Sequence, residues 1–171
     1  MSHKPFDALS REDLLELLNI FSKCTVAIDG LWFQAIESKY GMDEAMAHNN
    51  SVWGKYGVVE ARKLKAFLSL PDRAGIEGLR RALACRVFYQ SEQSRIELDG
   101  NVLTFYIETC RVQSARQRKG LPLHPCKNTG IADFTAFAKE IDDRFQMDCV
   151  SCFPDLTDPT CACIWRFTLV E

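Results

Sequence analysis

The chain has 171 residues, of which 47% are hydrophobic and 26% are charged, and its formal net charge is −2. This length and composition fit one domain with a sizeable core, so we expect a single domain over residues 1–171. The slightly negative charge argues against bulk nucleic-acid binding, which needs a strong positive field. The sequence has neither a signal-peptide layout nor an uncharged apolar stretch of about 18 residues. We therefore expect a cytoplasmic protein that does not cross a membrane.

The chain from about residue 10 to residue 90 has the periodicity of helices. Ser10 and Asp13 resemble a capping box, and Leu14, Leu18 and Phe21 follow at helical spacing. The loops between helical segments are short, which predicts that the helices pack as neighbours. After the first helix we expect four more, over about residues 29–41, 43–56, 58–70 and 76–89.

The chain from about residue 93 to residue 171 has a different pattern. Alternating and β-branched residues around a turn at 99–101 predict a hairpin of strands 95–98 and 102–110. A short basic helix over 113–119, an amphipathic helix around Phe134 and two final strands, 146–153 and 161–170, should follow. The fold class expected from this order is α+β, with a helical N-terminal layer packed on a mostly antiparallel sheet formed by the C-terminal half.

The chain has eight cysteines, and six of them follow residue 109. A reducing cytosol disfavours disulfides, which leaves metal ligands, reactive thiols or small buried side chains. Cys149 and Cys152 have the spacing of a zinc-binding pair. A loose hairpin over the last two strands brings Cys163 near that pair, and Cys126 can approach from a Pro-rich loop. We therefore predict zinc as a cofactor, bound by Cys126, Cys149, Cys152 and Cys163.

Two other interpretations of the cysteines stay open. Several of them can be core side chains, and Cys24 and Cys85, within helical segments, are expected to be buried packing residues. Alternatively, Cys149 and Cys152 form a redox pair. That option has little support, because a thioredoxin-type motif needs a βαβ context and a helix N-terminus.

The short basic helix is the main candidate for ligand binding. One interpretation is a solvated helix that pairs with acidic neighbours. The other is an anion site in which Arg111 or Arg116 holds a carboxylate and Gln113 adds a directional hydrogen bond. Farther upstream, Asp29 and Trp32 are either a helix cap and a core aromatic, or an acid beside an aromatic pocket wall. The candidate ligand-binding residues are Arg111, Gln113, Arg116, Lys119, Asp29 and Trp32.

Cys110 is the candidate catalytic nucleophile. Arg111 and the N-terminus of the following helix are expected to lower the pKa of its thiol. Among the three histidines, His124 is the plausible base or metal ligand, because it lies close to Cys126 in the sequence.

Several motifs together carry a family resemblance. They are residues 29–33, 110–121, 125–127, the pair Cys149 and Cys152, and Cys163 with Trp165 and Phe167. On these motifs the chain resembles a group of small cytosolic prokaryotic proteins of unknown function. More distantly, its C-terminal layout is similar to L-2-amino-thiazoline-4-carboxylic acid hydrolase-like proteins and to vinyl-reductase-type ligand-binding domains. The resemblance implies that Cys110, Cys126, Cys149, Cys152 and Cys163 belong to a family pattern, and the distant families imply a small-molecule site.

Two functional hypotheses follow. The first is a small-molecule-binding or sensory domain with a structural zinc, whose ligand is apolar or carries a carboxylate. The second is a hydrolase of a cyclic amidine or amide bond, which uses either the Cys110 thiolate or a zinc-bound water. A protein-interaction module without a pocket remains a third hypothesis, and a homo-oligomer stays open.

Overall fold

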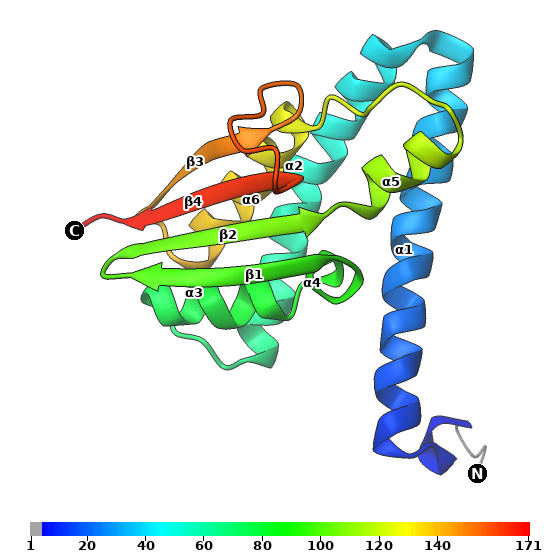
Figure 1. Ribbon diagram of the computed structural model, residues 1–171. Helices are drawn as coiled ribbons and strands as arrows, with labels where there is room; N and C mark the ends of the chain where they lie inside the picture. Colours follow the sequence, from blue (N-terminus) through cyan, green and yellow to red (C-terminus); the bar gives the residue numbers. More distant parts are fainter. Residues whose placement is uncertain (1–4) are drawn as a thin grey trace.

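A four-stranded antiparallel sheet and the helices behind it form the body of the protein (Figure 1). The computed structural model describes residues 5–171, and the side chains of residues 6–89 and 92–171. The strands are β1 (Gln93–Asp99), β2 (Val102–Thr109), β3 (Phe145–Cys152) and β4 (Cys163–Leu169), in the order β1-β2-β4-β3. The predicted α+β class is confirmed.

The helices pack mainly on one face of this sheet. Behind the sheet lie α2 (Met42–Phe67), α3 (Gly75–Ala84) and α6 (Lys127–Ile141), with the short α4 (Val87–Ser91) at one end (Figure 1). The core between these layers is apolar, and Leu79, Leu83, Phe137, Phe167 and Trp165 are almost fully buried in it.

Two further helices lie beside the sheet. The 30-residue helix α1 (Arg11–Tyr40) follows a 3-10 turn, η1 (Pro5–Ala8), and its N-terminal half extends beyond the body (Figure 1). The short α5 (Arg111–Arg118) leaves the end of β2 and lies between the sheet and α1. The predicted capping box is present, since the Ser10 and Asp13 side chains each bond the other's backbone N–H.

Three predicted helix boundaries were wrong. Residues 29–40 continue the first helix instead of starting a new one, and the helices predicted over 43–56 and 58–70 are parts of the single helix α2, which ends at Phe67. Conversely, the helix expected over 76–89 is interrupted at Arg86, whose backbone is extended with φ −66° and ψ 151°. The contacts of Gly57 and Arg86 account for the residues at two of these boundaries.

A glycine is required at position 57 of α2 because α6 passes very close to it. A Cβ atom at this position would lie 2.6 Å from the Asp133 carbonyl oxygen. Arg86 leaves helical geometry because its side chain is inserted between α2 and α6, where Glu60 and Asp133 bind it. The glycine between two predicted helices is therefore a packing requirement within one helix, and an arginine that was predicted to be helical is a buried anchor.

Candidate functional site

A cavity of about 570 Å³ lies where α1, α5 and the body meet. Its walls come from α1, α2, α4, α5 and α6, from strands β2, β3 and β4, and from the loop that precedes α6. This volume lies within the range typical of small-molecule sites, about 300–1,000 Å³. Most of the wall is hydrocarbon, including Val26, Phe33, Ile107, Phe134 and Trp165.

Gly130 on α6 lets Trp165 of β4 close one side of the cavity. A Cβ atom at residue 130 would lie 2.3 Å from Cη2 of the Trp165 ring, which is closer than atoms pack. Phe134, one turn farther along α6, also contacts that ring, with centroids 4.9 Å apart. Strand and helix thus fix this aromatic wall before any ligand binds.

A buried ion cluster supports the cavity next to Phe134. The Arg86 guanidinium donates to Glu60 Oε2 and to both Asp133 oxygens, each at 2.8 Å. Only 2% of Arg86, 8% of Glu60 and 5% of Asp133 is exposed. Burial alone would lower the pKa of Arg86, but the two carboxylates hold that pKa above its usual range. Of the three, Asp133 lines the cavity.

Two more carboxyl groups line the cavity, Asp29 and Glu92. Burial raises the pKa of Asp29, although the Trp53 indole N–H donates to its Oδ1 at 3.2 Å and opposes the shift. Burial also raises the pKa of Glu92 to about 7, despite the Arg111 backbone N–H at 2.7 Å. Glu92 therefore changes charge near neutral pH, and the interior of the cavity disfavours an anion.

His124 is buried in the loop that precedes α6. The Gln113 amide holds its backbone at both ends, donating to the His124 carbonyl at 2.8 Å and accepting from its N–H at 3.0 Å. The imidazole meets Phe33 edge-on, with ring centroids 4.5 Å apart, and lies 3.5 Å from the Asn49 amide. Gln113 therefore acts as a clamp on this loop, and its amide is already used.

The predicted zinc ligands lie at the junction of α6, β3 and β4. Cys126 is the residue before α6, and its Sγ lies 3.6 Å from the Sγ of Cys152 on β3. Cys152 pairs directly with Cys163 across the β3–β4 ladder, and the Trp165 indole N–H donates to the Cys163 sulfur at 3.1 Å. Cys149 is part of the same strand as Cys152, but it does not line the cavity.

These thiols influence one another. The hydrogen bond with Cys152, together with burial, raises the pKa of Cys126, and His124 opposes that shift. A hydrogen bond with Cys126 lowers the pKa of Cys152, but contact with Cys163 and burial outweigh it. Across the described side chains, no group of three or more His, Cys, Asp or Glu is arranged so that it could hold a metal ion.

Cys110 differs from its prediction. It precedes α5 and lines the cavity as expected, and backbone N–H groups of α5 do act on its thiol. Burial and the nearby Glu92 charge outweigh them and raise the pKa of Cys110 to about 12. The expected lowering of this pKa was wrong, and Cys110 stays a protonated thiol at neutral pH.

The predicted ligand-binding residues have unequal outcomes. Arg116 lines the cavity, but its guanidinium is held by both oxygens of Glu37, at 2.8 and 2.6 Å, so the expected free carboxylate fork is not found. Lys119 lies at the cavity mouth and donates to Gln34 at 2.9 Å. The prediction that Trp32 binds the ligand was wrong, because this side chain is 68% exposed and does not line the cavity.

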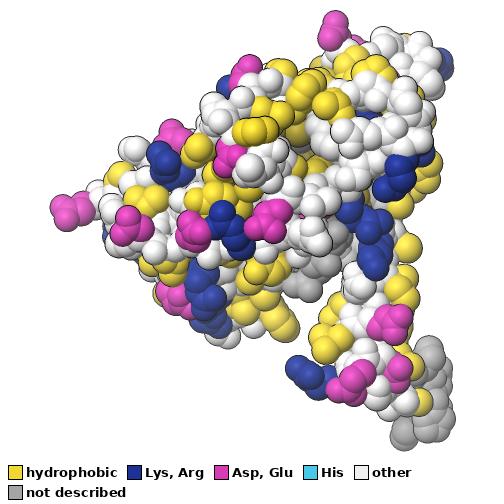
Figure 2. All heavy atoms as spheres, in the orientation of Figure 1, with side chains coloured by type: hydrophobic (Ala, Val, Ile, Leu, Met, Phe, Trp, Pro, Cys, Tyr) yellow, Lys and Arg dark blue, Asp and Glu magenta, His cyan; other side chains and the backbone are white. Residues whose placement is uncertain are grey.

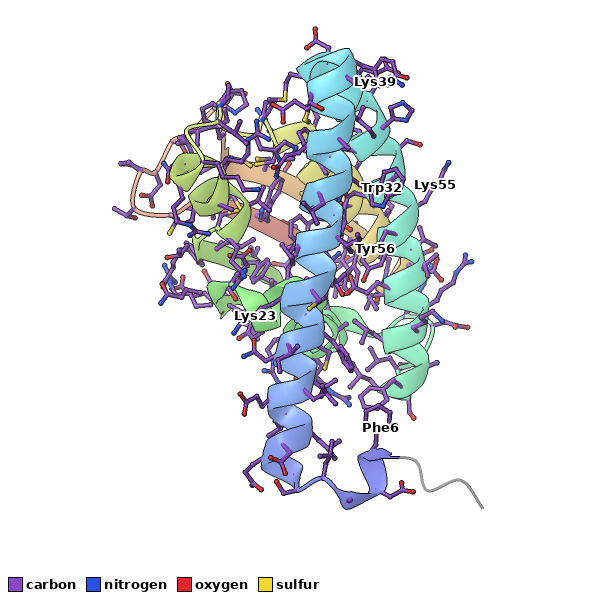
Figure 3. The ribbon with its side chains drawn as sticks, turned by 90° about the vertical axis from the view of Figure 1, so that its right-hand side faces the viewer. Phe6, Lys23, Trp32, Lys39, Lys55 and Tyr56 are labelled. Atoms are coloured by element: carbon purple, nitrogen blue, oxygen red, sulfur yellow. The ribbon has the colours of Figure 1, made fainter. Side chains whose placement is uncertain are left out.

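A cationic rim surrounds the mouth of the cavity between α1 and α5. Lys23, Arg111 and Arg118 line this mouth and are exposed. Figure 2 shows Lys and Arg side chains gathered where α5 lies against α1. In Figure 3, Lys23 lies on the side of α1 away from α2, whereas Trp32 lies on the side of α2. Among the described residues, the unpaired charges at the site are thus separated: the exposed cations lie at the mouth and the Asp29 and Glu92 carboxyl groups inside, while the buried Arg116 is paired with Glu37.

The two cysteines that were expected to be buried, Cys24 and Cys85, are exposed, so that expectation was wrong. Sequence reasoning also missed Trp53, Glu92 and Asp133. A signal for Asp133 existed, since Cys126, Thr129, Gly130, Asp133 and Phe134 are spaced for one face of a helix, and all five line the cavity. A carboxylate on such a face requires a buried partner, which points to a built site.

The fold and the cavity together define an α+β protein with a largely apolar, pre-formed internal site. The chain belongs to the family of unknown function DUF6125, which matches residues 7–169. This agrees with the resemblance to an uncharacterised family, but it supports neither the two distant resemblances nor a prokaryotic origin. No curated protein matches the chain. Over residues 5–171, no helix has the length and apolar character that a bilayer crossing requires.

Proposed function

We propose that this chain is a cytosolic domain that binds a small amphipathic molecule, with an apolar body inside the cavity and a carboxylate at its mouth. The cavity carries the proposal, because its largely hydrocarbon wall gains free energy by excluding water from an apolar group. Asp29 and Glu92 disfavour an anion inside, while Lys23, Arg111 and Arg118 attract one at the rim. The ligand should therefore enter with its charged end outward.

Parinaric acid, a fluorescent fatty acid, tests this proposal, with its methyl ester as the matched neutral ligand. We expect saturable fluorescence for the acid and weaker binding of the ester. The variant Arg111→Glu with Arg118→Glu should lose this preference, whereas Lys63→Glu with Lys139→Glu, which changes the net charge equally but away from the mouth, should keep it. If neither probe binds, the proposal fails. Equal binding of the acid and the ester would contradict only the part of the proposal that places a carboxylate at the mouth.

We further propose that Cys126, Cys149, Cys152 and Cys163 bind a structural zinc. Tetrahedral zinc with zinc–sulfur bonds of about 2.3 Å keeps its sulfurs roughly 3.8 Å apart. The Cys126–Cys152 separation of 3.6 Å fits this spacing. Side-chain rotation at Cys149 and Cys163 would complete the set, since neither is yet grouped around a metal position. The ion would join the N-terminus of α6 to β3 and β4.

Metal analysis after reductive, chelator-free purification tests the zinc proposal. We expect close to one zinc per chain, and loss of the metal in Cys126→Ser with Cys152→Ser. Cys24→Ser with Cys85→Ser is the matched control, because these exposed thiols lie outside the cluster. Less than about one tenth of an equivalent of zinc would contradict the proposal. The parinaric acid experiment tests ligand binding at the cavity independently, so a protein without zinc would not contradict the ligand-binding proposal.

The hydrolase alternative receives less support from the geometry. Its thiolate form needs an activated Cys110, and its substrate clamp needs a free Arg116. Burial raises the pKa of Cys110 to about 12, and Glu37 occupies the Arg116 guanidinium. A zinc-bound water remains the one form of this alternative that these two observations leave open.

A further inference from the structure

Helix α1 carries an apolar stripe that nothing in the described chain covers. Leu14, Leu18, Phe21, Thr25, Ile28 and Trp32 recur at alternating intervals of four and three residues. This is the heptad spacing of a helix-packing seam. Among them, Leu18 is 61% exposed, Phe21 52% and Trp32 68%. Large apolar side chains with this spacing and exposure indicate a surface that is built to pack against something.

The stripe is not the side of α1 that packs on the body. The buried residues of α1 are Ser22, Val26 and Phe33, which follow the stripe positions Phe21, Thr25 and Trp32 by one residue. One residue corresponds to about 100° around a helix. Packing within the chain therefore explains the buried stripe only, and the exposed one needs a separate explanation.

Helix α2 extends the apolar surface. Val52 and Val59 are 57% and 48% exposed, on a helix whose buried side includes Trp53 and Gly57. Figure 3 shows α1 and α2 side by side, with Trp32 between them on the outer surface. We define the α1–α2 face by its large apolar members, which are Leu14, Leu18, Phe21, Ile28, Trp32, Val52 and Val59.

The area of this face matches what a stable dimer buries. Seven large apolar side chains, each 38–68% exposed, leave on the order of 700 Å² of surface per chain. A standard interface buries about 800 Å² on each partner, and the largest apolar patch of a typical monomer is about 300–600 Å².

We propose that the α1–α2 face binds the same face of a second copy, in a two-fold symmetric packing of four helices. A stripe with heptad spacing is self-complementary when the partner helix is identical. The flanking positions Leu15, Leu17, Ser22, Cys24 and Leu31 are uncharged. The remaining flanking position, Asp29, lines the cavity, where the Trp53 indole N–H binds it.

A lipid surface fits this face less well. Interfacial helices carry Lys and Arg on their polar side. The projecting end of α1 instead has Glu12, Asp13 and Glu16 against Arg11, and Figure 2 shows acidic side chains near that end. An anionic membrane would repel it.

Sedimentation equilibrium on the full chain tests the dimer. We expect a dimer for the wild type at about 100 µM. The variant Leu18→Glu with Ile28→Glu should be a monomer, with association weakened at least about 100-fold. The control is Leu98→Glu with Leu156→Glu, which replaces two leucines of similar exposure, 45% and 46%, elsewhere on the surface and should remain a dimer. Far-UV circular dichroism checks that all variants fold.

A milder variant covers the case in which the glutamates unfold α1. Leu18→Ala with Ile28→Ala keeps or raises helix propensity, so any loss of the dimer reflects lost side-chain contacts. A monomeric wild type at about 100 µM would overturn the proposal, as would a seam variant with wild-type association. A monomer that sediments with phosphatidylglycerol vesicles would also overturn it, in favour of a membrane surface.

Discussion

Replacement of Arg86 by methionine should destabilise the protein strongly, because it leaves two buried carboxylates without a cation, although the Val87 N–H still donates to Glu60 at 3.1 Å. The structure gives the magnitude. Three hydrogen bonds of 2.8 Å disappear, and Glu60 and Asp133 are only 8% and 5% exposed. Breaking one side of a buried ion pair costs about 3–5 kcal/mol. The loss should be largest at high pH, since protonation of the stranded carboxyl groups relieves it in acid.

Urea unfolding of Arg86→Met and of a matched surface variant measures this effect. Arg80 donates to Glu77 at 2.7 and 2.6 Å, so its bonding resembles that of Arg86, but both partners are exposed. Arg80→Met should change the free energy of unfolding far less, because water replaces the lost partner. Adding Glu60→Gln and Asp133→Asn to Arg86→Met should recover part of the loss. Equal effects of the two arginine replacements would refute the reasoning.

Three further predictions concern the cavity wall. Glu92→Gln should remove a pH dependence of stability, because burial raises the pKa of Glu92 from 4.5 to about 7. The wild type should lose stability as pH rises from about 4.5 to about 7, where only the unfolded state ionises at this position, and the loss is complete above pH 7. After discounting for partial exposure, the variant should gain about 1–2 kcal/mol over the wild type at pH 8, and unchanged pH profiles would contradict this. Gly130→Ala should lower the free energy of unfolding by about 1–3 kcal/mol and shift the tryptophan fluorescence, because the added Cβ would lie 2.3 Å from the Trp165 ring. Gly54→Ala is the control and should be tolerated, since its Cβ would lie 3.5 Å from the nearest atom. Equal stabilities of the two variants in urea would contradict this prediction. Iodoacetamide should label the exposed Cys24 and Cys85 before Cys110, whose pKa is raised to about 12. Mass spectrometry of the labelled peptides measures this order, and faster labelling of Cys110 would contradict the prediction.

The element types of this fold could be read from the sequence, because each type has its own apolar period. The hairpin of β1 and β2 and the capping box of α1 were predicted closely, since both depend on residues a few positions apart. Helix boundaries could not be read in the same way. Gly57 lies within α2 and is a glycine because Asp133 passes beside it, and Arg86 interrupts a helical segment because Glu60 and Asp133 bind it. These partners lie far along the chain.

The candidate site was predictable to a similar depth. The spacing of the cysteines in the sequence pointed to Cys126 and Cys152, whose sulfurs lie 3.6 Å apart. It could not reveal that Glu37, 79 residues away, forms an ion pair with Arg116. The prediction for Trp32 failed because the sequence did not show which side of α1 faces the cavity. Trp32 and Phe33 are adjacent, so they differ by about 100° around α1, and only Phe33 points into the cavity.

The site depends above all on one face of α6, and this has a consequence for ligand entry. Each position on that face is fixed by a different element: Asn49 of α2 bonds Thr129, Trp165 of β4 covers Gly130, and Arg86 binds Asp133. A wall held at so many points is pre-formed and cannot open without breaking buried polar contacts. The opposite wall, formed by α1 and α5, carries the exposed cations of the mouth. A ligand should therefore enter between α1 and α5, and substitutions on those two helices should change binding rates, whereas substitutions on α6 should change affinity through the fold itself.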